Sequence, residues 1–214
     1  MKSIVAMLIL TLVVTYPSCA QKNQPGKNDI HVGGLCEGCE AVYESRVLFE
    51  KLNNIDTLPD FNENGPKMEI SGIVYQLNGQ PAANIILYIY HTDQSGVYPN
   101  KGNETGWAKR HGFIRGWIKT NEKGEYKFYT LRPGAYPGRQ NPEHIHPIIK
   151  EPGKTEYYID EYLFDDDPIL TKAFRDRQEQ RGGTGIVVLK KNNDRLFCER
   201  NIYLGKNIPG YPAQ

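Results

Sequence analysis

The chain has 214 residues, and its 26 Lys and Arg nearly balance its 25 Asp and Glu, which gives a formal net charge of +1 at pH 7. The basic residues are spread along the sequence, so the charge pattern excludes the concentrated positive surface of a nucleic-acid-binding protein. A chain of this length suits one domain with a single core, and it contains no internal repeat and no coiled-coil heptad.

Residues 1–20 have the pattern of a signal peptide. Their apolar run, residues 4–14, is too short to span a bilayer as a helix and is typical of a signal-peptide core. Two cleavage sites compete: a lipoprotein site, which would make Cys19 a lipidated first residue attached to a membrane, and an ordinary cut after Ala20. We favour the first, because residues 21–34 would then serve as a flexible tether. Either site predicts export to a bacterial cell envelope, as a lipoprotein or as a periplasmic or secreted protein.

Three further cysteines, Cys36, Cys39 and Cys198, would meet an oxidising compartment after export. The first two can bond each other, or one of them can bond Cys198 and leave a free thiol, and the spacing does not decide between these pairings. No second ligand pair and no thioredoxin-like pattern accompanies the C-x-x-C, so we interpret it as structural rather than as a zinc or redox site. It opens a Cys-containing N-terminal segment, residues 35–66, in which residues 39–54 predict a short amphipathic helix.

From residue 67 the hydrophobic periodicity changes to that of β-strands. Turns rich in Gly and Pro separate these strands, and NEKG joins FIRGWIKT to EYKFYTL in a predicted hairpin. A short helix is expected over residues 169–180. Seven or eight strands with only short N-terminal and C-terminal helices predict an all-β fold, a single β-sandwich of the transthyretin (prealbumin)-like Greek-key type over residues 67–210. Exposed sheet edges would also allow a homodimer.

The most informative segment carries an H-x-H motif on a predicted strand. Because successive strand side chains point to opposite faces, His144 and His146 would project from the same face. A metal ion is one reason for two adjacent imidazoles, although an H-x-H on a strand, taken alone, is more often a pair of surface or hydrogen-bonded histidines. Pro147 follows directly and removes a backbone donor, so we expect this strand to lie at a sheet edge or to be bulged.

Two tyrosines indicate which metal this would be. Tyr136 precedes the histidines, and Tyr98 lies in a turn that follows another predicted strand. A phenol has a pKa of about 10, but a hard trivalent cation can hold it as phenolate, whereas zinc sites favour His, Cys and carboxylate ligands. Two phenolates and a hydroxide would neutralise Fe(III) in a partly buried site. We therefore predict an Fe(III) site of Tyr98, Tyr136, His144 and His146.

Four stretches carry a resemblance to a known family: ISGIVYQLNGQPAANIILYIYHTDQSGVY, FIRGWIKTNEKGEYKFYTLRPGAYP, HIH and RNIYLGKNIPG. In this order they resemble the intradiol ring-cleavage dioxygenases, the family of catechol 1,2-dioxygenase and protocatechuate 3,4-dioxygenase, over roughly residues 70–204. The resemblance implies an oxidoreductase of aromatic-compound catabolism. Such an enzyme cleaves a catechol-type ring between its two hydroxylated carbons with O2, giving a muconate-type diacid.

The resemblance also implies a role for each ligand. Tyr98 and His144 would be equatorial, Tyr136 and His146 axial, and a hydroxide would complete the site. A catechol would bind as a dianion through both oxygens and displace the hydroxide and Tyr136, which makes this tyrosine a ligand that moves. The ferric ion would act as a Lewis acid and template.

Two positions depart from the family pattern. Many members have an arginine three residues before the first histidine, where this chain has Asn141; Arg139 lies nearby and would have to replace it, because an amide is neutral and donates only two hydrogen bonds. Glu161 stands where members often have a glutamine near the substrate. Its charge would disfavour anionic substrates such as protocatechuate unless it is protonated or paired with Arg139. These three residues and Tyr136 are the predicted catalytic residues.

Two alternatives remain. The stretches NGQPAANI and NEKGEYKF are also typical of small transthyretin-like modules that serve as binding or spacer domains on envelope proteins, and the histidines would then be incidental. Such a module, of about 80–100 residues, does not account for the second half of the chain. The other alternative is an iron-binding family member with little turnover, because of Asn141 and Glu161.

Overall fold

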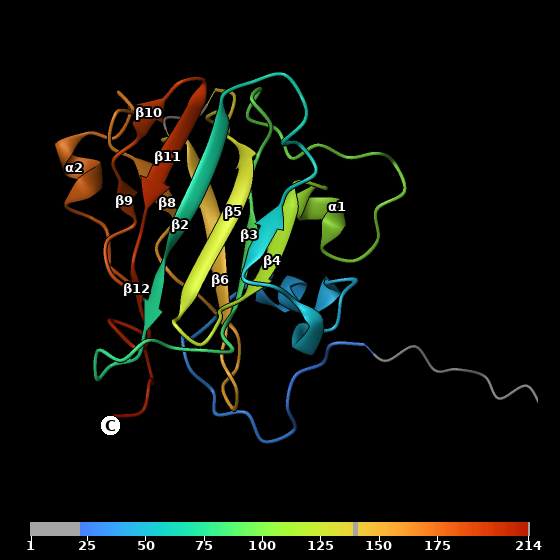
Figure 1. Ribbon diagram of the computed structural model, residues 1–214, viewed down its shortest axis with the longest axis vertical. Coiled ribbons are helices and arrows are strands. Elements are labelled where there is room, and N and C mark those ends of the chain that lie inside the picture. Colours follow the sequence, from blue (N-terminus) through green and yellow to red (C-terminus); the bar gives the residue numbers. More distant parts are fainter. Residues whose placement is uncertain (1–21, 139–140, 214) are drawn as a thin grey trace, which may run out of the picture.

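The computed structural model describes residues 22–138 and 141–213. The predicted signal peptide, with Cys19, and the candidate Arg139 lie outside these residues. The described chain is mostly β-structure in two six-stranded sheets that lie one in front of the other in Figure 1. The prediction of an all-β sandwich with short helices is confirmed at this level, and the Greek-key connection remains a prediction.

The first sheet has the strand order β1-β5-β2-β11-β10, and β12 also pairs with β2. Its centre is the antiparallel pair of β2 and β5, the long green and yellow arrows at the front of Figure 1. The strand β1 pairs with β5, so the sheet begins within the segment assigned to residues 35–66. The bounds are β1 Ile55–Thr57, β2 Lys67–Tyr75, β5 Glu125–Leu131, β10 Lys190–Asn192, β11 Arg195–Glu199 and β12 Ile202–Tyr203.

The second sheet has the order β4-β3-β6-β8-β9, and β7 also pairs with β6. Its pairs are antiparallel except for β8 and β9. The bounds are β3 Ile86–Tyr90, β4 Arg115–Lys119, β6 His144–Lys150, β7 Tyr157–Tyr158, β8 Tyr162–Phe164 and β9 Ile186–Val187.

The main core lies between the two sheets, and both sheets contribute alternate side chains to it. In β3, Leu87 and Ile89 face this core together with Phe128 of β5. The alternate residues Tyr88 and Tyr90 face the opposite side, where they pack against the N-terminal segment in a second, smaller cluster. The second sheet is therefore covered on both faces.

Short helices complete the fold. The predicted helix over residues 39–54 is instead two 3-10 helices, η1 (Cys39–Glu44) and η2 (Phe49–Lys51). The first follows the Cys36–Cys39 disulfide and packs on β6, so tertiary contacts replace the longer helix that periodicity indicated. Cys198 is free and buried.

Two four-residue α-helices also occur, α1 (Ala108–His111) and α2 (Lys172–Arg175). The second lies within the helix predicted over residues 169–180 and is capped by the Thr171 side chain, which accepts a hydrogen bond from the backbone N–H of Phe174. No helix of the described chain is long and apolar enough to cross a membrane.

The strand β6 is not an edge strand, so the prediction from Pro147 was wrong on this point. It pairs with β3 on one side and with β8 and then β7 on the other. The second neighbour changes at Pro147: β8 pairs with residues 144–145 and β7 with residues 148–149. The missing N–H thus falls where the ladder is interrupted, which an interior strand can tolerate.

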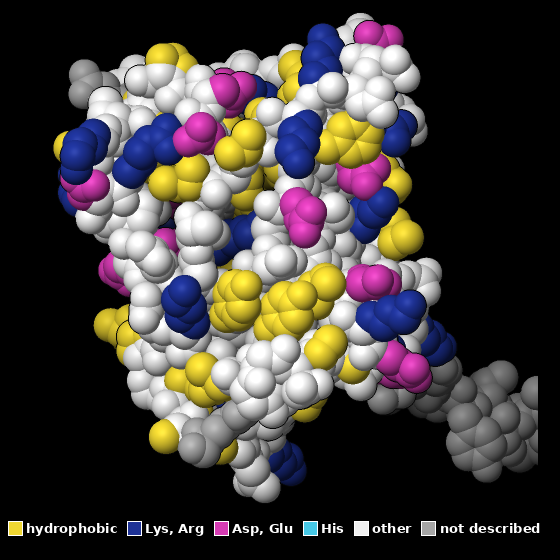
Figure 2. All heavy atoms as spheres, turned by 60° about the vertical axis from the view of Figure 1, so that its left-hand side comes forward, with side chains coloured by type: hydrophobic (Ala, Val, Ile, Leu, Met, Phe, Trp, Pro, Cys, Tyr) yellow, Lys and Arg dark blue, Asp and Glu magenta, His cyan; other side chains and the backbone are white. Residues whose placement is uncertain are grey.

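The surface carries charges of both signs. On the face shown in Figure 2, Lys and Arg side chains are interspersed with Asp and Glu side chains, and hydrophobic side chains lie between them. This mixture agrees with the near-zero net charge of the sequence.

Phe128→Ala should lower the free energy of unfolding by about 3–5 kcal/mol, because Phe128 is fully buried between the sheets and its removal leaves a cavity. Urea denaturation measures the change. Val188→Ala is the control: this side chain is 62% exposed, and its loss should change stability by less than about 0.5 kcal/mol. Equal effects of the two substitutions would contradict the assigned core.

Candidate metal centre

Four side chains from three separate parts of the chain converge on the outer face of the second sheet. His144 and His146 come from β6, Tyr98 from the loop after β3, and Tyr136 from the loop between β5 and β6. Tyr98 Oη lies 2.8 Å from His146 Nε2, and Tyr136 Oη lies 3.2 Å from the same atom and 3.0 Å from His144 Nε2. The two Nε2 atoms are 3.1 Å apart, and the two phenol oxygens contact each other. The structure therefore brings together all four residues of the predicted Fe(III) site.

Two close-packed loops bring the tyrosines together. The backbone N–H of Gly134 donates to the Asp93 carbonyl at 2.9 Å, and the Thr92 hydroxyl donates to the Gly134 carbonyl at 2.8 Å. Gly96 has a φ of 78°, and a Cβ there would lie 1.9 Å from the carbonyl oxygen of Ala135. Only glycine allows this approach, so the loop of Tyr98 can lie directly against the loop of Tyr136.

The separations of His146 Nε2 from both phenol oxygens and from His144 Nε2 fit a single metal ion. Two atoms that each lie about 2.0–2.1 Å from an ion are about 2.8–3.4 Å apart when the angle at the ion is between 90° and 110°. The distances from His146 Nε2 to Tyr98 Oη and Tyr136 Oη, 2.8 and 3.2 Å, fall in this range. Two phenol oxygens and two imidazole nitrogens suit a hard, highly charged cation better than zinc.

The electrostatics of the cluster also suit a cation. Burial raises the pKa of the Tyr98 phenol far above its usual value, and the hydrogen bond to Tyr136 raises it further. Burial lowers the pKa of His144, and the neighbouring His146 lowers it again, so His144 stays neutral as a metal ligand must. A bound cation would reverse the first effect, because it stabilises phenolate.

The far nitrogen of each imidazole is occupied by a protein acceptor. His144 Nδ1 lies 2.7 Å from the Pro142 carbonyl oxygen, to which it donates a hydrogen bond, and this leaves the lone pair of Nε2 facing the cluster. His146 Nδ1 lies 3.0 Å from Glu161 Oε1. Both rings are thus held in the orientation that presents Nε2 to a common point.

Glu161 lies behind His146 rather than among the residues that line the pocket at the cluster. Burial raises the pKa of Glu161, but the hydrogen bond from His146 and the nearby imidazoles lower it more, so the net pKa lies below the ordinary value and the group is ionised. In the described chain, His144, His146 and Glu161 form the one group of three His, Cys, Asp or Glu ligand atoms close enough to hold a metal, within 4.8 Å. Asn141, the other departure from the family pattern, is exposed.

A pocket of about 220 Å³ opens beside the cluster. One wall is a stack in which the Tyr90 ring lies between His146, at 4.6 Å, and His111, at 3.8 Å between ring centroids. At the rim, the exposed side chains of Arg110 and Glu37 form an ion pair. The lining residues are Glu37, Tyr90, Tyr98, Trp107, Arg110, His111, Tyr136 and His146.

Sequence reasoning missed several of these lining residues. Glu37 lies within the disulfide loop, and His111 ends α1, a helix that no sequence pattern indicated. Their place beside the cluster depends on how the N-terminal segment packs on the sheet, and no local sequence pattern predicts this packing. Tyr90 could have been found, because it stands near the end of the predicted strand ANIILYIYH, just before the loop that carries Tyr98.

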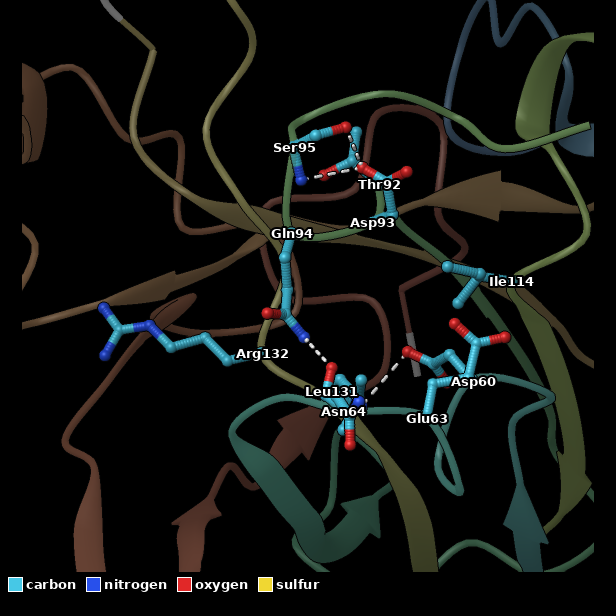
Figure 3. Close-up of a pocket in the computed structure, with 10 residues that line it drawn as sticks. All are labelled: Asp60, Glu63, Asn64, Thr92, Asp93, Gln94, Ser95, Ile114, Leu131 and Arg132. Carbon is cyan, nitrogen blue, oxygen red and sulfur yellow. Dashed lines mark hydrogen bonds between the residues drawn. The ribbon is translucent and has the colours of Figure 1, made fainter.

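A second cavity of about 220 Å³ lies between loops that carry acidic residues, but it has no metal-ligand geometry (Figure 3). Its buried carboxylate, Asp60, accepts hydrogen bonds from the Thr130 hydroxyl at 2.9 Å and the Leu131 N–H at 3.1 Å. Asp93 accepts from the backbone N–H and hydroxyl of Ser95. In the described residues no three ligand atoms meet there, so the candidate site is the tyrosine–histidine cluster.

Comparison with known proteins gives a consistent family signal. Residues 49–181 match the family model described as Dioxygenase. The protocatechuate 3,4-dioxygenase beta chain of Burkholderia cepacia is 26% identical over 112 residues, which cover 50% of this chain and 48% of the relative. Catechol 1,2-dioxygenase 1 of Acinetobacter lwoffii is 31% identical over 90 residues, covering 42% of this chain and 28% of the relative. The chain thus matches less than half the length of these curated relatives.

Solved structures share the fold. The catechol 1,2-dioxygenase of Pseudomonas arvilla C-1 aligns with a TM-score of 0.54 at 18% identity, covering 71% of this chain and 56% of that one. An intradiol ring-cleavage dioxygenase from Tetranychus urticae has a TM-score of 0.51 at 22% identity, covering 77% and 91%. The dioxygenase domain of a carbohydrate-binding fusion protein from Streptomyces sp. SirexAA-E has a TM-score of 0.51 at 21% identity, covering 67% and 82%.

His111→Gln should reduce the fall in the free energy of unfolding that occurs as the pH is lowered below about 6.5. Burial lowers the pKa of His111 to about 3, and the neighbouring His146 and arginines lower it too. Below about pH 6.5 the unfolded chain therefore binds a proton that the folded chain does not, so stability falls with pH in this window. The wild type should lose about 2–4 kcal/mol more than the variant between pH 7 and pH 4.

Denaturant unfolding at several pH values measures this difference. His31→Gln, at an exposed histidine, is the control and should keep the slope of the wild type. Parallel profiles for the wild type and His111→Gln would contradict the assigned environment of His111.

Proposed function

Because the chain belongs to the intradiol dioxygenase family, we propose that it is an oxidoreductase that cleaves a catechol-type ring between its two hydroxylated carbons. Both atoms of O2 would enter the product, a muconate-type diacid. Tyr98, Tyr136, His144 and His146 would hold ferric iron. The observation that carries this proposal is the meeting of two phenol oxygens and two imidazole nitrogens at one point beside a pocket.

When bound, ferric iron would supply the Lewis acidity that draws electron density from a catecholate. The protein would supply position and proton transfer. His144 and His146 are held by acceptors behind their rings, so they would stay in place while a substrate binds. Tyr136, which the family resemblance makes the axial tyrosine, would be the ligand that yields its place, its Oη taking a proton from a catechol hydroxyl.

The pocket fits a flat, uncharged ring. The rings of Tyr90, Trp107 and His111 line it and would exclude water from the reacting carbons. The negative charge of Glu161 lies close behind His146, and Glu37 stands at the rim. Glu37 is paired with Arg110, so Glu161 would be the charge that disfavours a substrate with its own carboxylate, and we propose neutral catechols rather than protocatechuate-like acids.

Export to the cell envelope is part of the proposal and rests on the sequence of residues 1–20. The Cys36–Cys39 disulfide supports it, because such bonds persist in oxidising compartments. Attachment through a lipidated Cys19 and pairing into a homodimer through sheet edges complete the proposal.

The purified, iron-loaded protein should be coloured, because phenolate bound to ferric iron gives a visible charge-transfer band. Tyr98→Phe and Tyr136→Phe should shift or bleach this band, and absorption spectra with iron analysis measure it. Tyr203→Phe is the control: Tyr203 stacks on Tyr75 within the first sheet, which does not carry the candidate ligands, so its loss should leave the spectrum unchanged. A folded wild type that stays colourless and free of iron would instead favour a transthyretin-like binding module.

Adding a catechol to the iron-loaded wild type should consume one O2 per ring. His144→Ala should lower kcat/KM by more than about 100-fold, because it would remove a proposed iron ligand itself. Loss of a residue that only hydrogen-bonds to a ligand typically costs about 10–100-fold. An oxygen electrode and the ultraviolet absorbance of the diacid follow the reaction. Iron binding without oxygen uptake would mean an iron-binding member with little turnover, and the enzyme proposal would be wrong.

A further inference from the structure

The position of Glu161 is set by the backbone of the second sheet. In the β6–β8 ladder, Leu163 opposes His144 and Tyr162 opposes Ile145. The same antiparallel register, continued by one residue, puts Glu161 opposite His146, on the face that carries the candidate ligands. The carboxylate therefore reaches the imidazole as a cross-strand neighbour, and the distance of 3.0 Å from Oε1 to Nδ1 follows from this pairing.

The residue before Glu161 is anchored as well. The carboxylate of Asp160 accepts the backbone N–H groups of Gln180 and Arg181, at 2.8 and 3.0 Å. The backbone N–H of Asp160 donates to the Arg181 carbonyl at 3.1 Å. The backbone of Glu161 is thus held between the anchored Asp160 and the start of β8, which lowers the entropic cost of keeping its side chain on His146.

The two candidate histidine ligands have different partners behind them. His144 donates from Nδ1 to a neutral carbonyl, that of Pro142, whereas His146 faces a carboxylate. A proton shared with an anion leaves more electron density on the ring than one shared with an amide carbonyl, so Nε2 of His146 is the stronger donor of the two. Among the described residues, His146 is the only ion-pair partner of Glu161.

Glu161 cannot be a further ligand of the same ion in this arrangement. The two nitrogens of an imidazole ring point in different directions, and Nε2 of His146 points to Tyr98 Oη and His144 Nε2. The carboxylate lies at Nδ1, on the other side of the ring. Its influence on a bound ion must therefore pass through His146.

We infer that Glu161 is a positioning residue that fixes the ring of His146 and strengthens its Nε2 as a ligand. This inference rests on the proposed function, because it needs ferric iron in the site. A glutamine here could accept the same hydrogen bond only through a neutral oxygen, and the ring would donate less strongly. The chain thereby holds its iron more tightly and makes it a weaker Lewis acid than a glutamine-bearing site would.

Glu161→Gln is the direct test, because it keeps the shape of the side chain and removes its charge. We expect its iron affinity, measured by competition with a chelator, to fall about 10–100-fold. The charge-transfer band should move to longer wavelength, because a weaker donor leaves the ferric ion a better electron acceptor. Both measurements are made without substrate, so they do not depend on turnover.

Two further variants separate the effect of the contact between Glu161 and His146 from the effect of the negative charge alone. Glu161→Asp keeps the charge but shortens the side chain, so it should lose the contact with Nδ1 and behave like Glu161→Gln. Glu199→Gln removes one negative charge from an exposed position on β11 of the other sheet and should behave like the wild type. Circular dichroism confirms that each variant is folded. If Glu161→Gln does not fold, Glu161→Asp against the wild type decides the question.

The outcomes distinguish the two proposals. A wild type that binds no iron and stays colourless overturns the proposed function, and this inference with it. A coloured wild type whose affinity and band are unchanged in Glu161→Gln overturns the inference alone. Equal changes in Glu161→Gln and Glu199→Gln would also overturn it, since the effect would then be one of overall charge.

Discussion

The site depends on the register of one interior strand, β6. Its alternation puts His144 and His146 on the outer face and Ile145 and Ile149 in the main core, so moving either histidine would cost buried packing. The same register places Tyr90 of β3 against His146 on one side. The candidate ligand pair, its stacking partner and the carboxylate behind it are therefore consequences of two strand pairings that the hydrophobic core already enforces.

The outer face of this sheet would be exposed without the N-terminal segment. The 3-10 helix η1 buries Cys39 and Val42 against Tyr88 and Ile148, and the Trp117 indole N–H donates to the Val42 carbonyl at 2.9 Å. The same segment supplies the rim of the pocket. The packing of the N-terminal segment thus covers an apolar sheet face and also shapes the pocket beside the candidate ligand cluster. For this reason the disulfide loop belongs to the site, although it contains no candidate ligand.

The sequence predicts what is local and misses what depends on distant pairing. The placement of His144 and His146 on one face follows from a period of two, so it needs no tertiary information. The helix predicted over residues 39–54 was wrong because a disulfide and a sheet face decide the backbone there. Of the two outcomes predicted from Pro147, an edge position or a bulge, the edge position was wrong because the change of the neighbouring strand at Pro147 is not visible in the motif. The contact of Glu161 with His146 needs the β6–β8 register, which no single segment specifies.

Charge balance connects the departures from the family pattern with the proposed chemistry. Without a cation, burial keeps the Tyr98 phenol neutral while Glu161 is ionised, so one carboxylate charge already lies behind the cluster. If both phenols were phenolates, their charges and that of Glu161 would together match a trivalent ion. A catecholate dianion would then exceed this balance unless one phenol left with a proton, and Tyr136 is the ligand to which the family resemblance gives this role. In the proposed iron site, this extra carboxylate would favour the release of a tyrosine more strongly than a neutral amide would.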